Sequence, residues 1–196
     1  MPLVEPLSPD HDGEVKELAE FFMGPLGFTP NSILTMQRRP AIAKAFIELN
    51  KAVTEPISIN NQLKRLIGYM TSVTTGCRYC QAHLALGSSR YGADDEKIQA
   101  VWEFRTSTLF SDAERAALEF AHAAASVPNA VTPEIADELR KHWDDDAIVE
   151  ILAEVALMGF LNRWNDSMGT ELEDAPKALG DGVLAEVGWE IGKHRR

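Results

Sequence analysis

Residues 63–91 have the sequence LKRLIGYMTSVTTGCRYCQAHLALGSSRY. The first half carries apolar side chains at the i, i+3, i+4, i+7 spacing of an amphipathic helix, which is predicted to end at Gly76. A second helix is predicted from Cys77 to Tyr91, where Gly92 follows. The sequence therefore predicts two consecutive helices with a pair of cysteines near their junction. The apolar stripe of the first helix consists of Leu63, Leu66, Ile67, Met70 and Val73.

Helical patterns continue on both sides of this pair, and no segment has a convincing strand pattern. Ser111, followed three residues later by Glu114, has the form of a capping box and predicts a helix start. Residues 146–162 are apolar almost all round, which predicts a central buried helix. We therefore expect an all-α fold, a compact multi-helix domain. The other predicted helices cover residues 14–23, residues 33–53 with a break at Pro40, a segment capped by Asp94 or Asp95, and a short stretch from Pro133.

The composition limits the classes of function. With 196 residues and 45% hydrophobic content, the chain can bury a sizeable core in one domain. Its formal charge of −11 argues against sequence-independent binding to nucleic acid or to an anionic lipid surface. No apolar run approaches the roughly 18 residues of a membrane span, and residues 1–13 lack the basic start and apolar run of a secretion signal. We therefore expect no nucleic-acid or membrane partner and a cytoplasmic location.

The two cysteines of the chain, Cys77 and Cys80, lie three positions apart. A disulfide between them would close a very short loop and constrain the unfolded chain little. Stabilisation of the fold by a disulfide therefore explains the two cysteines poorly. On an ideal helix, Cys80 lies one turn from Cys77 and one turn from His83, within side-chain reach of both. This spacing indicates redox chemistry, with His83 deprotonating or stabilising a Cys80 thiolate and Cys77 closing a disulfide.

Other interpretations of the two thiols stay open at this point. The N-terminus of a helix favours a thiolate, and Cys77 lies nearest to it, so the order of attack is not decided by spacing. Cys77, Cys80 and His83 supply three ligands for a metal ion, but no second Cys–His cluster follows, and no metal is expected. The cysteines could also pack as small apolar side chains beside a hydrogen-bonded histidine.

An internal similarity joins the cysteine region to a later segment. Residues 65–80 align without gaps on residues 150–165, and each segment passes from an apolar helix into a polar–Arg–aromatic–polar tetrad. In this alignment Cys77 falls on Asn162 and Cys80 on Asn165. The alignment suggests an internal helical repeat in which the first copy alone has thiols; the alternative is chance similarity between two buried helices.

The segment GCRYCQAH at residues 76–83 resembles the core motif of the alkyl hydroperoxidase D-like (AhpD-like), or carboxymuconolactone decarboxylase, family. The resemblance covers roughly residues 30–172 and implies an all-helical fold whose subunits associate as homo-oligomers. Residues 1–29 then form an N-terminal helical extension, and residues 173–196 form a C-terminal tail that packs on the domain or on a neighbouring subunit. Further matching segments are residues 110–118, 131–134 and 160–166.

The family's best-understood members reduce peroxides with the paired cysteines. By resemblance, Cys80 is the peroxidatic thiol, Cys77 resolves it, and His83 belongs to the proton relay. Two positions depart from the family pattern. Arg65 replaces a glutamate twelve residues before the first cysteine, and His83 follows the second cysteine by three residues rather than four. The usual relay is therefore incomplete or rebuilt here. Candidates for relay or support are Tyr79, Arg65, Glu119 and Glu150.

These observations predict an alkylhydroperoxidase-like, peroxiredoxin-type enzyme that reduces hydroperoxides through a Cys-x-x-Cys dithiol/disulfide cycle. An external dithiol would restore the reduced state, and in some family members a lipoylated protein supplies it. No flavin, haem or nicotinamide motif is present, so no cofactor is expected. Two alternatives are a carboxymuconolactone decarboxylase-type enzyme that does not use the thiols and a non-catalytic oligomeric redox-sensing protein.

Overall fold

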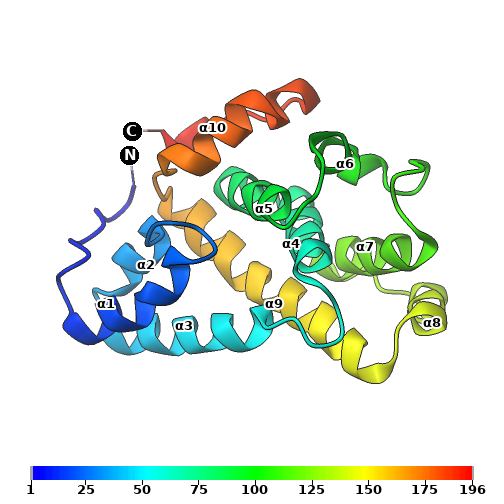
Figure 1. Ribbon diagram of the computed structural model, residues 1–196, viewed down its shortest axis with the longest axis horizontal. Helices are drawn as coiled ribbons and strands as arrows, with labels where there is room; N and C mark the ends of the chain where they lie inside the picture. Colours follow the sequence, from blue (N-terminus) through cyan, green and yellow to red (C-terminus); the bar gives the residue numbers. More distant parts are fainter. Residues whose placement is uncertain (1, 196) are drawn as a thin grey trace.

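The computed structural model describes residues 2–195. Within these residues the chain forms ten α-helices and four short 3₁₀ helices and contains no β-strand, which confirms the predicted all-α fold (Figure 1). The α-helices are α1 (Gly13–Ala19), α2 (Asn31–Met36), α3 (Pro40–Thr54), α4 (Asn61–Thr75), α5 (Arg78–Arg90), α6 (Asp95–Gln99), α7 (Asp112–Ala125), α8 (Pro133–His142), α9 (Asp145–Met168) and α10 (Asp174–Gly182).

The core lies around α4, which packs against α5, α7 and α9. The predicted apolar stripe of α4 faces this core, where Leu66, Ile67 and Met70 are fully buried. Helix α9 also packs against α3, so it connects the N-terminal helices to the rest of the domain (Figure 1). No helix within residues 2–195 combines the length and apolar character that a membrane span requires.

The junction between α4 and α5 differs in detail from the prediction. Helix α4 ends at Gly76, whose φ of 81° lies in the left-handed region that glycine adopts without a steric cost. Helix α5 then begins at Arg78, one residue later than predicted, and Cys77 is its N-cap with an extended backbone. Cys77 is therefore not part of the regular helical turn on which its spacing to Cys80 was based.

The two segments of the suggested internal repeat have different local structures. Residues 65–80 break at Gly76 into two helices, whereas residues 150–165 continue unbroken within α9. The polar–Arg–aromatic–polar tetrad therefore starts a new helix in the first segment and lies inside a helix in the second.

The N-terminal helices form a second apolar cluster against α9. Pro40 divides this region as predicted and opens α3, and Pro30 precedes α2. The cluster brings the segment before α2 close to the cysteine region and closes one side of the site described below. Its buried members include Val15, Phe22, Ile33, Met36, Ile47 and Leu157.

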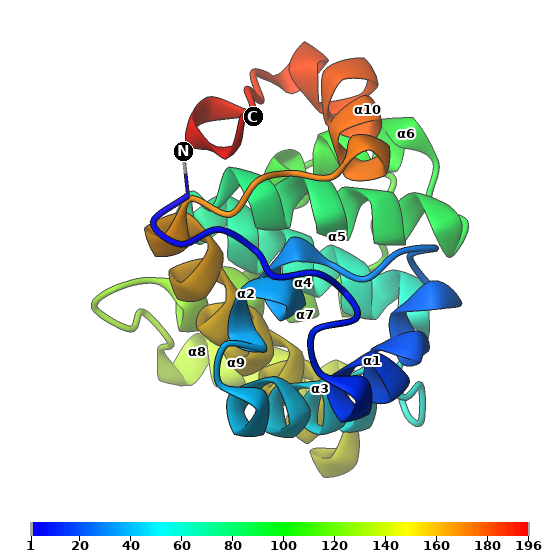
Figure 2. The ribbon, with the colours of Figure 1, turned by 90° about the vertical axis from the view of Figure 1, so that its left-hand side faces the viewer.

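The C-terminal segment packs on α5 of its own chain. Helix α10 lies along α5, and Figure 2 shows this segment on the far side of α5 from α1 and α3. The Trp189 indole donates a hydrogen bond to the carbonyl oxygen of Arg78 at 3.1 Å. An added Cβ at Gly180 would lie 2.6 Å from the Trp189 ring, so glycine permits this close approach. The tail thereby brings its own polar side chains to the N-terminal end of α5.

Candidate active site

The Cys77 sulfur lies at the start of α5, where it caps the helix. Its Sγ accepts a hydrogen bond from the backbone N–H of Cys80 at 3.4 Å, and its side chain is fully buried. Both cysteines are free thiols in this structure. The side chains of Cys77 and Cys80 also interact with each other at the start of α5.

The Cys80 sulfur is held by an amide from α9. Asn165 Nδ2 donates to Cys80 Sγ at 3.5 Å, and both side chains are buried. Burial raises the pKa of the Cys80 thiol well above its usual value, and the neighbouring Cys77 sulfur raises it further, while the Asn165 amide lowers it. Cys80 is therefore a protonated thiol at neutral pH and needs a base before it can attack.

Cys80 lines an apolar cavity between the N-terminal helices, α5 and α9, whereas Cys77 does not. His83 and Asn165 reach the same cavity and are among its few polar groups. Of the two thiols, Cys80 is therefore the one that a small apolar ligand entering the cavity would contact. The apolar walls include Phe22, Leu26, Ile33, Leu84 and Leu161.

His83 is bound to a carboxylate from the C-terminal segment. Its Nε2 lies 2.6 Å from Glu173 Oε2, and both side chains are largely buried. The Tyr79 ring stacks on the imidazole with centroids 4.4 Å apart, and its hydroxyl donates to Glu173 Oε1 at 2.8 Å. The backbone N–H of Asn31 donates to the same oxygen at 2.5 Å. Among residues 2–195, no hydrogen bond joins His83 directly to Cys80.

Glu173 is ionised at neutral pH despite its burial. Burial by itself raises the pKa of this carboxyl, but the charge and hydrogen bond of His83, with the bonds from Asn31 and Tyr79, lower it below its usual value. The carboxylate fixes the orientation of the His83 ring through this contact. The hydrogen-bonded pair therefore places an imidazole beside the cavity that Cys80 lines.

Arg65 lies beside the same cavity, where the family pattern has glutamate. Its guanidinium is 3.9 Å from the Glu154 carboxylate, which is fully buried. Burial raises the pKa of Glu154, while Arg65 and Lys64 oppose the rise. A Cβ at Gly68 would lie 2.8 Å from Glu154 Oε1 and 2.7 Å from Leu84, so any other residue there would displace these two side chains.

Two of the predicted supporting carboxylates have ion-pair partners outside the cavity. Glu119 forms a bidentate pair with Arg105, with distances of 2.5 and 2.6 Å, on the partly exposed face of α7. Glu150 lies 2.8 Å from Lys64 and accepts the backbone N–H of Ser58 at 2.7 Å. Neither Glu119 nor Glu150 lines the cavity with Cys80.

Sequence reasoning did not identify Glu173 or Asn165 as site residues. Asn165 is the residue that the internal alignment paired with Cys80, and the two side chains are in contact. Glu173 lies in a Gly-rich C-terminal region with a weak helical pattern and is 90 positions from His83. No local signal marks a contact over such a separation.

Comparison with known proteins supports this description of the fold. The carboxymuconolactone decarboxylase family model matches residues 40–123, which include both cysteines. The debrominase Bmp8 has a TM-score of 0.87 and is 37% identical, covering 93% of this chain and 98% of its own. That solved structure is a cysteine-to-alanine variant in complex with 2,3,4-tribromopyrrole.

More distant relatives share the fold. An uncharacterized peroxidase-related protein from Ralstonia eutropha JMP134, with an alkylhydroperoxidase AhpD core, has a TM-score of 0.75 at 22% identity over 84% of this chain and 88% of its own. YnjA from Escherichia coli (strain K12) is 34% identical over 92 residues, or 47% of this chain. That match spans half of the length of YnjA.

Proposed function

Because the chain belongs to the carboxymuconolactone decarboxylase family, with its AhpD-like members, we propose that it is a thiol-dependent reductase that removes bromine from a small brominated aromatic ring. Cys80 attacks the substrate, and Cys77 resolves the product of that attack. The observation that carries this proposal is the position of Cys80 in an apolar cavity, with a second thiol directly behind it. The likeness to the debrominase Bmp8 over nearly the whole chain supports the choice of substrate.

The reaction balances with two thiols and no cofactor. Hydroxide from solvent first removes the proton of the Cys80 thiol. The Cys80 thiolate then attacks bromine, forms an S–Br bond and leaves the electron pair of the C–Br bond on the ring carbon, which takes a proton from His83. The Cys77 thiolate then attacks the Cys80 sulfur, forms the disulfide and releases bromide. The net change converts the aryl bromide and two thiols into the arene, one disulfide and HBr. An external dithiol restores the thiols by exchange, and a lipoylated protein is one carrier of suitable chemistry.

His83 is the proton donor in this proposal. It lines the cavity with Cys80, and Glu173 and Tyr79 hold its ring. A protonated imidazole paired with a buried carboxylate is suited to deliver a proton to the ring carbon. Glu173 positions the donor and does not itself touch the substrate.

Hydroperoxide reduction is the second candidate, because the same pair of thiols suits it. The Cys80 thiolate would attack the O–O bond to form a sulfenic acid, and Cys77 would condense with it to give the disulfide and water. The two reactions differ in the electrophilic atom, oxygen or bromine, and share the thiol chemistry.

The test is to mix the reduced full chain with 2,3,4-tribromopyrrole and related polybrominated pyrroles, and separately with cumene hydroperoxide. We expect bromide release with two thiols lost per bromide, faster than with free dithiothreitol. Thiol loss with cumene hydroperoxide, but not with the brominated pyrroles, would select the second candidate. If neither compound oxidises the protein faster than a free thiol, both redox functions are excluded, and decarboxylation of lactones becomes the next assay.

Replacing Glu173 tests the proton donor. Glu173→Gln is expected to slow bromide release about 10- to 100-fold, because the neutral amide removes the charged partner that orients the His83 ring. Steady-state rates should be compared with those of Glu190→Gln, which removes an exposed carboxylate from the same C-terminal segment. Equal rates in the two variants would rule out the Glu173–His83 pair as the source of the proton.

A further inference from the structure

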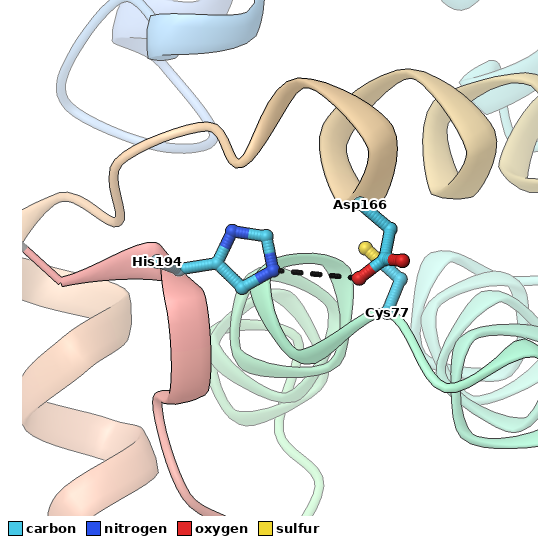
Figure 3. Close-up of side chains that lie close together, drawn as sticks. All are labelled: Cys77, Asp166 and His194. Carbon is cyan, nitrogen blue, oxygen red and sulfur yellow. Dashed lines mark ion pairs between the residues drawn. The ribbon is translucent and has the colours of Figure 1, made fainter. Parts of the chain in front are cut away.

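A second cluster of chemically active side chains lies on the other side of Cys77. The Cys77 sulfur, a carboxylate oxygen of Asp166 and an imidazole nitrogen of His194 all lie within 4.8 Å of one another. Figure 3 shows the three side chains converging from the start of α5, the end of α9 and the C-terminal 3₁₀ turn Gly192–His194. A thiolate, a carboxylate and an imidazole are the ligand types that zinc takes in proteins.

The imidazole of His194 has a free nitrogen aimed into this cluster. Its Nδ1 lies 2.7 Å from the carbonyl oxygen of Thr170, which can only accept a hydrogen bond, so Nδ1 carries a proton. Its Nε2 has no hydrogen-bond partner, although the residue is only 1% exposed. The nearest oppositely charged atom is Asp166 Oδ1 at 3.8 Å, beyond hydrogen-bond distance (Figure 3).

A histidine whose Nδ1–H is held by a backbone carbonyl, with a bare Nε2, has the arrangement of a metal-ligating imidazole. An unpaired buried acceptor is costly, and a bound cation would remove that cost.

The other two groups are also available to a cation. Asp166 Oδ2 binds Lys193 Nζ at 2.9 Å, which leaves Oδ1 directed toward His194. The Asp166 side chain is 42% exposed, so it connects the buried Cys77 and His194 to solvent. A tetrahedral zinc ion needs ligand atoms roughly 3.4–3.6 Å apart. Closing the present separations therefore requires shifts of about 1 Å, and the fourth position stays open to water.

We propose that Cys77, Asp166 and His194 form a binding site for a zinc-class divalent cation, with three protein ligands and one water. The Cys77 sulfur cannot bind the cation and join a disulfide with Cys80 at the same time. The site therefore binds metal in the reduced protein and releases it on oxidation. As a consequence that rests on the proposed function, bound metal holds the resolving thiol and blocks the disulfide-forming step.

Titration of the reduced full chain with Co²⁺ tests the site, because thiolate ligation gives a charge-transfer absorption band and tetrahedral geometry gives strong visible bands. We expect one Co²⁺ per chain, displaced by Zn²⁺, and no such band in the disulfide form. Cys77→Ser should abolish the charge-transfer band, and Asp166→Asn and His194→Gln should each weaken binding at least about tenfold. Cys80→Ser, which removes the thiol outside the cluster, and His142→Gln, which alters a histidine on α8, should bind as wild type does.

Absence of the charge-transfer band, or the same affinity in Cys77→Ser and His194→Gln as in wild type, would overturn the proposal. Circular dichroism of each variant separates loss of a ligand from loss of the fold. The titration uses no substrate, so its failure leaves the proposed reductase intact. Conversely, a cobalt band in a protein that debrominates nothing would support the metal site and reject the reductase.

Discussion

Cys80→Ser is expected to lower the rate of substrate-dependent disulfide formation by about 10³-fold or more, because it removes the thiol that lines the cavity. Stopped-flow measurement of thiol loss and of bromide release should show this decrease with whichever substrate oxidises the wild-type protein. The serine hydroxyl fits the same space and can still accept from Asn165, so the fold should be retained. Cys77 remains reduced in this variant because it does not reach the cavity.

Cys77→Ser is expected to fail at a later step. The first attack by Cys80 proceeds, but no second thiol resolves its product, so a single turnover occurs and a sulfenyl species accumulates. Trapping that species with dimedone, followed by mass spectrometry of the Cys80 peptide, measures it. If Cys80→Ser rather than Cys77→Ser accumulates the sulfenyl species, Cys77 is the attacking thiol and the order proposed here is reversed.

The pH dependence of the same reaction follows from the burial of Cys80. Burial raises the pKa of its thiol, so the fraction of thiolate keeps increasing with pH beyond the range where an exposed cysteine is fully ionised. The rate of wild-type thiol loss should therefore still rise above about pH 8.5, the usual pKa of a free cysteine. A rate that reaches its plateau below that pH would show that another group takes the proton before Cys80 attacks.

Much of the fold could be predicted because it depends on short-range patterns. The stripe of α4 is a local signal, and its members are buried as the spacing requires. The capping box at Ser111 and Glu114 forms both of its hydrogen bonds. Gly76 ends α4 in the left-handed conformation that glycine favours. In each case, residues within one or two helical turns determine the outcome.

The site was less predictable because its polar groups come from distant segments. Cys77 and Cys80 could be found from their spacing, but the partners of His83 and Cys80 lie 90 and 85 positions away. The C-terminal segment supplies Glu173 and the buried His194. Its few apolar positions give a weak pattern, and its packing on α5 depends on single close contacts such as that of Trp189 with Gly180. Such contacts depend on tertiary geometry that helical periodicity does not encode.

Lys64→Ala is expected to destabilise the protein by about 3–5 kcal/mol, because it removes one partner of a buried ion pair. The Lys64 ammonium is 1% exposed, lies 2.8 Å from Glu150 and donates to the carbonyl oxygens of Val53 and Glu55 at 2.8 and 2.5 Å. Without it, two carbonyl groups and a largely buried carboxylate lose their donor. Equilibrium unfolding in urea measures the loss. Lys51→Ala, which breaks an exposed pair with Glu48, is the matched control and should cost less than about 1 kcal/mol.

The pH dependence of stability separates the ion pair from the loss of side-chain volume. Burial by itself raises the pKa of Glu150, but Lys64 and the bonds from Ser58 lower it from 4.5 to about 2. A lowered carboxyl pKa contributes stability that is fully present above the unfolded value and is lost as pH falls through the folded value. Wild type should therefore lose stability between about pH 4.5 and pH 2, and Lys64→Ala should lose less over that interval.

Lys64→Met, which keeps the apolar stem without the charge, should match Lys64→Ala in this flatter pH dependence. A wild-type pH dependence in either variant would show that Lys64 stabilises the fold by packing and not through its ion pair with Glu150.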